Sequence, residues 1–84
     1  MPTLGIGYQD KWTSICVTYN GKVVELTNFY DKDFSDIAYR INQYTELYDV
    51  NYILLDEKEK TLYEELCKEI NISKIYQYNK DKQM

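Results

Sequence analysis

The chain has 84 residues and a net charge of -4, which is typical of one small acidic domain with a thin hydrophobic core. Hydrophobic residues make up 44% of it, too many for wholesale disorder. No apolar run approaches the roughly 18 residues of a membrane span, and the N-terminal sequence lacks the basic and apolar segments of a secretory signal. We therefore expect a cytoplasmic protein without membrane contact: one α/β domain over residues 1–78 and a flexible tail over residues 79–84.

The charge and the absence of histidine exclude several classes of function. Ten Lys and Arg residues stand against fourteen Asp and Glu residues. Because nucleic-acid affinity comes largely from phosphate neutralisation, direct nucleic-acid binding is not expected. Without histidine the chain has neither a Cys/His zinc site nor a His general base. The two cysteines, Cys16 and Cys67, each lie within an apolar pattern and are expected to be reduced and buried; a disulfide between them is the alternative.

The first part of the chain predicts three strands. Residues 4–8 alternate apolar side chains with Gly5 and Gly7, which is typical of a strand where glycine allows close packing or a bulge. Residues 13–19 also alternate and predict a second strand. The Asn-Gly pair at residues 20–21 is the strongest local signal for a type I′ hairpin, and it predicts a third strand from residue 22 to about 29.

A helix and a fourth strand are predicted next. Asp33 is a candidate N-cap, and apolar residues follow it at spacings of three and four as far as residue 48. Residues 52–55 form a continuous apolar run. Such a run is typical of a strand that is buried on both faces, in the centre of a sheet with parallel neighbours.

The remaining residues predict a second helix and an edge strand. Asp56 and Glu59 form an approximate capping arrangement for the helix, and Asn71 stands where a left-handed C-cap is expected. Residues 73–78 predict the last strand. The fold class is therefore α/β (α+β), with the order β-β-β-α-β-α-β and a mixed five-stranded sheet that carries two helices.

This order, with LGIG at residues 4–7 and YILLD at residues 52–56, resembles the ribonuclease H-like fold over residues 3–78. Within that superfamily the chain is most similar to the nuclease domains of phage packaging terminases and to junction resolvases. The resemblance implies two divalent metals, held by carboxylates in the first strand and at the end of the fourth. Asp56 matches the fourth-strand position, but the first-strand position falls near Gly7 or Tyr8. The resemblance therefore implies a shortened, inactive relative.

The acidic residues allow two interpretations. In one, a minimal metal-dependent nuclease uses Asp56 together with Asp10 or Glu57 and binds Mg²⁺ or Mn²⁺. In the other, Asp56 caps the second helix and Asp10 is a turn residue before the second strand, so no residue is catalytic and no metal is bound.

Tyrosine is the most unusual component of the sequence, with ten residues. Four tyrosines fall on apolar stripes and are expected in or beside the core: Tyr19, Tyr44, Tyr52 and Tyr63. Tyr and Trp are enriched at protein interfaces because they offer a large contact area at a low cost in side-chain entropy. The aromatic residues selected as candidate binding residues are Trp12, Tyr30, Tyr39, Tyr76 and Tyr78. The alternative is that a thinly cored domain uses these residues as half-buried surface.

The leading interpretation is a small non-catalytic protein that acts through protein–protein contact and needs no cofactor. Size and composition are typical of accessory proteins of viruses and mobile elements, so the expected partner is a nucleic-acid enzyme of the host. The acidic surface would then compete for that enzyme's basic groove. The alternatives are the nuclease, an adaptor in a viral packaging or replication assembly, and a homodimer formed through the edge at residues 73–78 or the hairpin edge.

Overall fold

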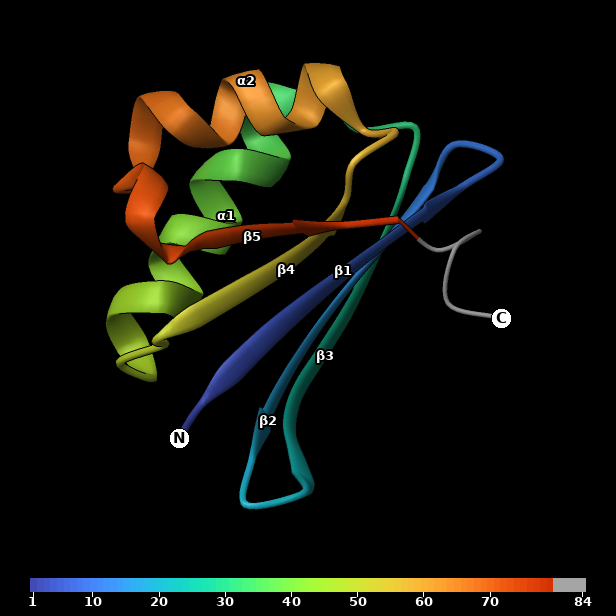
Figure 1. Cartoon of the computed structure of the whole chain (residues 1–84). Helices are drawn as coiled ribbons and strands as arrows, with labels where there is room; N and C mark the ends of the chain where they lie inside the picture. The colour runs from blue at the N-terminus through green and yellow to red at the C-terminus, as the bar shows by residue number, and fades with distance from the viewer. Residues whose placement is uncertain (80–84) are drawn as a thin grey trace.

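Five strands form one mixed sheet in the computed structural model, which describes residues 1–79 (Figure 1). The strand order is β3-β2-β1-β4-β5. The elements are β1 (Thr3–Gln9), β2 (Trp12–Tyr19), β3 (Lys22–Tyr30), α1 (Phe34–Leu47), β4 (Tyr52–Asp56), α2 (Lys60–Glu69), a short 3₁₀ helix (Ile72–Lys74) and β5 (Ile75–Tyr78). The predicted class and element order are confirmed. From residue 80 onward, the predicted tail lies outside the described residues.

Two tight hairpins connect the three antiparallel strands. Asn20 and Gly21 have φ angles of 52° and 79°, as a type I′ turn requires. Asp10 and Lys11, between β1 and β2, have φ angles of 52° and 69° and form a turn of the same kind. The Asn-Gly prediction is confirmed, and Asp10 is the turn residue that one interpretation expected.

The second half of the sheet is parallel because a helix precedes each added strand. The chain leaves β3, forms α1 and returns as β4 beside β1, with Leu4 opposite Ile53. It then forms α2 and returns as β5 beside β4, with Ile53 opposite Ile75. The N-terminal strand β1 therefore lies at the centre of the sheet, between an antiparallel and a parallel neighbour.

Both helices pack on the same face of the sheet (Figure 1). The buried apolar side chains of the strands all point to this side and meet the apolar stripes of α1 and α2. They form one core of Leu4, Ile6, Ile15, Val17, Ile37, Ala38, Ile41, Tyr44, Val50, Ile53, Leu55, Leu62, Leu66 and Ile70. We call this side the helix face. No helix in the described part of the chain is long and apolar enough to cross a membrane.

Two tyrosines link the C-terminal end of α1 to the edge strand β3 on the helix face. The hydroxyl of Tyr44 lies 2.7 Å from Thr27 Oγ1, and the hydroxyl of Tyr48 donates to Glu25 Oε1 at 3.0 Å. That carboxylate acceptor, together with partial desolvation, raises the pKa of Tyr48. The hydrogen bonds fasten the second half of α1 to β3.

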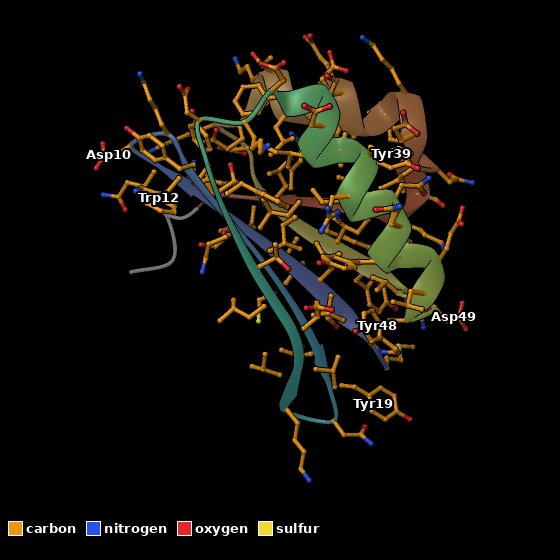
Figure 2. All side chains as sticks on the ribbon, turned by 180° about the vertical axis from the view of Figure 1, so that it is seen from behind. Asp10, Trp12, Tyr19, Tyr39, Tyr48 and Asp49 are labelled. Carbon is orange, nitrogen blue, oxygen red and sulfur yellow. The ribbon has the colours of Figure 1, made fainter. Side chains whose placement is uncertain are left out.

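Three predictions about buried residues are wrong. The two cysteines are not buried: Cys16 is half-buried on β2, and Cys67 is exposed on α2. The run at residues 52–55 is buried on one face only: Ile53 and Leu55 are in the core, whereas Leu54 is 39% exposed because neither helix reaches the other face. Tyr19 is 48% exposed because it lies at the tip of the β2–β3 hairpin, beyond the helices (Figure 2).

The predicted caps also need correction. Asn71 has a φ of -58° and is not a left-handed C-cap; its side chain accepts the backbone N–H of Ser73 at 3.0 Å and starts the 3₁₀ helix. Asp33 does precede α1 as its N-cap, without a capping hydrogen bond from its side chain. Glu59, rather than Asp56, holds the N-cap position of α2.

Candidate functional site: the open face of the sheet

The side of the sheet opposite the helices is left uncovered by the described residues. We call it the open face. The strand pairings and the alternation with buried residues assign these residues to it: Thr3, Gly5, Gly7, Gln9, Trp12, Ser14, Cys16, Thr18, Val23, Leu26, Asn28, Tyr30, Tyr52, Leu54, Asp56, Tyr76 and Tyr78.

A row of mainly apolar residues crosses the middle of the open face. The strand register places one residue of each strand in this row, in the order Leu26, Cys16, Gly5, Leu54 and Tyr76. Leu26 and Tyr76, at the two ends of the row, are 60% and 48% exposed. The row is therefore an apolar stripe in contact with water, with a glycine at its centre.

Two aromatic pairs lie on opposite sides of the central strand, one at an end of the open face and the other between its middle row and its opposite end. Trp12 and Tyr30 lie on β2 and β3 at the end where β1 finishes, with ring centroids 5.0 Å apart. Tyr52 and Tyr76 lie on β4 and β5, with centroids 5.1 Å apart, and Tyr52 is opposite the first residue of β1. The two pairs form raised ridges on either side of the central strand.

Gly5 and Gly7 leave a hollow between the ridges. Its volume is about 500 Å³, and its lining includes both glycines with Cys16, Leu54 and Tyr78. A Cβ added at either glycine would meet no atom within 4 Å, and neither residue has a positive φ. The pairing of β1 with β2 also runs without a bulge. The predicted roles in close strand packing or a bulge are therefore wrong, and we call these two residues the glycine strip.

Charge is almost absent from the open face. Of the residues that define it, Asp56 alone is charged, and its Oδ1 accepts the backbone N–H of Lys58 at 3.0 Å. The exposed acids of the two helices lie away from this face, at Asp36 and Glu46 on α1 and at Glu64 and Glu69 on α2. The protein thus has one acidic, helical side and one side that is nearly uncharged and aromatic.

The three acids of the nuclease interpretation have separate positions. Asp10 is exposed in the first hairpin turn. Asp56 is the last residue of β4, and its side chain accepts the backbone N–H of Lys58 in the following turn. The next residue, Glu57, accepts a hydrogen bond from Asn79 Nδ2 at 2.6 Å. No group of three or more Cys, Asp or Glu side chains suited to a metal ion occurs within residues 1–79. Partial burial and the nearby Asp56 carboxylate raise the pKa of Glu59 beside this turn.

Four of the five predicted aromatic binding residues lie on the open face: Trp12, Tyr30, Tyr76 and Tyr78. The fifth, Tyr39, lies on the outer side of α1, far from Trp12 (Figure 2). It borders a separate hollow of about 340 Å³, together with Lys32, Asp36 and Arg40. The Arg40 guanidinium there lies over the ring of Phe29, 5.5 Å from its centroid. The structure therefore separates Tyr39 from the other four.

Sequence reasoning missed the aliphatic and glycine members of the site. Leu26 and Leu54 both occur in strands with apolar residues on both faces, so neither stood out as a surface residue. The signal that identifies Leu54 is the unbroken apolar run at residues 52–55. A strand with one covered face needs an apolar residue only at every second position, so the run predicts apolar residues on both faces.

Comparison of the chain with protein-family models, with curated proteins and with solved structures finds no match. The functional interpretation therefore depends on the geometry and chemistry of the open face.

Proposed function

We propose that the protein is a non-catalytic binding protein that acts through protein–protein contact, and that the open face is its contact surface. The observation that carries the proposal is the uncharged, aromatic character of this face in a protein in which 29% of residues are charged. The centres of protein interfaces are enriched in Tyr, Trp and other large apolar residues and depleted in Asp, Glu and Lys.

The amount of exposed apolar surface supports the same function. Six side chains of the open face are between 39% and 60% exposed: Trp12, Val23, Leu26, Tyr30, Leu54 and Tyr76. With roughly 150–250 Å² for a large side chain, they leave on the order of 600 Å² in water. The hydrogen-bonded pair of Ser14 and Asn28 lies between the Trp12–Tyr30 pair and the apolar row. Exposed apolar patches of a few hundred Å² on a single protein are commonly binding sites.

The parallel part of the sheet gives a second, independent argument. Parallel strands are normally covered on both faces. Here β1, β4 and β5 are covered by helices on one face, and within the described residues the other face is bare. A protein partner that covers the open face would complete the usual arrangement of layers.

The experiment is a capture from an extract of the source cells, followed by binding of the purified partner. Intact protein, Trp12→Ser and Tyr39→Ser serve as three baits. Tyr39 is the matched control because it is as exposed as Trp12, at 57% against 51%, and lies on the other side of the molecule. Tryptophan is among the residues whose removal most often weakens an interface by more than tenfold.

We expect Trp12→Ser to raise the Kd of the purified partner at least tenfold and Tyr39→Ser to leave it unchanged. A partner that binds Trp12→Ser as tightly as the intact protein would contradict the assignment of the surface. Inhibition of a nucleic-acid enzyme and a role as an assembly adaptor are two ways for such contact to act, and the identity of the partner distinguishes them.

A further inference from the structure

We infer that the open face binds a second copy of this chain, so that two sheets pack face to face in a symmetric dimer. This inference rests on the proposed function and names the partner. It is carried by three features of the open face: the offset placement of the two ridges, the glycine strip between them, and the exposed area.

The offset placement of the ridges makes the open face complementary to itself. Consider a two-fold axis that runs between two copies, parallel to β1 and above it. This axis places β2 of one copy over β4 of the other, and β3 over β5. Trp12 is level with Gln9, two residues beyond the level of Asp56. The ridge of Trp12 and Tyr30 then lies just past the ends of β4 and β5, beside Asp56 and Tyr78, where the other copy has no ridge.

The same axis places the second ridge on other residues. Tyr52 of one copy lies over Thr18 of the other, and Tyr76, which is in the same row as Gly5 and Leu54, lies over Leu26. The two copies of each ridge therefore do not meet each other, and Tyr76 packs against an exposed apolar side chain. A symmetric dimer requires this property, because the same patch must fit itself.

The glycine strip lies on the proposed axis. Gly5 and Gly7 belong to β1, so the two central strands face each other where neither has a side chain at these positions. Glycine within a strand commonly marks a place where another backbone approaches closely. No atom of the described chain lies within 4 Å of the Cβ positions, so contacts within one copy give no reason for glycine here.

The exposed area agrees with the needs of a dimer. A standard protein interface buries about 800 Å² on each partner. The six most exposed apolar side chains of the open face supply on the order of 600 Å², and the partly exposed Cys16, Tyr52 and Tyr78 add to it. The face is also almost free of charge, so two copies meet without like-charge repulsion across its centre.

The first test is the mass of the full chain between about 10 μM and 1 mM, measured by sedimentation equilibrium or light scattering. We expect a mass that rises from 10.1 kDa towards twice that value. Leu54→Lys places a charge in the apolar row and is expected to weaken the dimer at least tenfold. Tyr39→Lys adds the same charge on the helical side and is expected to leave the dimer intact.

A second variant tests the arrangement itself. In the proposed dimer Leu54 of one copy lies over Cys16 of the other. Cys16→Asp alone is expected to weaken the dimer, as Leu54→Lys does. The two substitutions combined are expected to restore part of the affinity, because each new lysine then faces a new aspartate of the other copy. A combined variant that dimerises no better than Leu54→Lys alone would contradict this arrangement.

Each result decides a different point. A mass of 10.1 kDa for the intact protein at 1 mM would overturn the inference. A dimer that Leu54→Lys and Tyr39→Lys weaken equally would also overturn it, because the contact would then involve another surface. If the intact chain is monomeric and a different purified partner loses affinity in Trp12→Ser, the second-copy inference fails while the proposed function stands.

Discussion

Replacement of a glycine in the middle of a strand usually disturbs a protein, but Gly5→Val should stabilise this one. Gly5 has an ordinary strand conformation, and an added Cβ meets no atom within 4 Å. Glycine costs a strand interior about 0.5–1 kcal/mol because it loses more backbone entropy on folding. The new side chain also gains cross-strand contacts with Cys16 and Leu54, at about 0.2–1 kcal/mol each.

We therefore expect Gly5→Val to raise the free energy of unfolding by about 1 kcal/mol. For a domain of this size that corresponds to an increase in Tm of about 4–8 °C. The assay is urea unfolding, followed by the fluorescence of Trp12, at a concentration where light scattering gives the monomer mass. An unchanged or lower stability would refute the argument that the hollow is empty within one copy.

Gly21→Val is the matched control for this prediction. Gly21 has a φ of 79°, a conformation that a β-branched residue adopts only with strain. The same substitution should therefore lower the stability by about 1–3 kcal/mol. If Gly5→Val raises the stability and Gly21→Val lowers it, the difference comes from the backbone conformation at the two positions and not from valine itself.

Three further predictions concern hydrogen bonds, pH and metal. Tyr44→Phe removes the hydroxyl that lies 2.7 Å from Thr27 Oγ1 and should cost about 0.5–1.5 kcal/mol in urea unfolding; an unchanged midpoint would contradict a native hydrogen bond there. Because the pKa of Glu59 is raised above 4.5 in the folded state, stability should fall as pH rises through the folded pKa. Glu59→Gln should thus stabilise the protein at pH 7 and lose this advantage below about pH 4; a constant difference at both pH values would contradict the assignment. Millimolar Mn²⁺ should leave Tm unchanged, and Asp56→Ala should cost about 1 kcal/mol through the lost hydrogen bond to Lys58; a Mn²⁺-dependent rise in Tm that Asp56→Ala abolishes would revive the nuclease interpretation.

The sequence predicted the path of the chain well because its strongest signals are local. Asn20 and Gly21 determine a hairpin through their own backbone preferences, and the spacing of apolar residues determines α1 without reference to the rest of the molecule. Asn71 shows the limit of such signals. Its side chain can cap the next turn as readily as its backbone can end a helix, and the structure contains the first arrangement.

The candidate site was only partly predictable because exposure depends on which elements cover which face. The pattern at residues 52–55 correctly indicates two apolar faces, but it does not say whether the second is covered by the same chain. For the same reason the aromatic residues could be selected but not grouped. Trp12 and Tyr76 are 64 positions apart in sequence and share a face only because β1 and β4 pair in parallel.

The central position of β1 has a consequence for the kinetics of folding. Its contacts with β2 close a loop of two residues, whereas its contacts with β4 join positions about 49 residues apart, as in the pair Leu4 and Ile53. Contacts between distant residues are slow to form because the entropy of closing the loop is lost first. We expect the β1–β3 meander to form early and the arrival of β4 to limit the rate. Until β4 arrives, the open face of the meander and the unpaired edge of β1 are in contact with water, so the chain is most prone to aggregate at this stage.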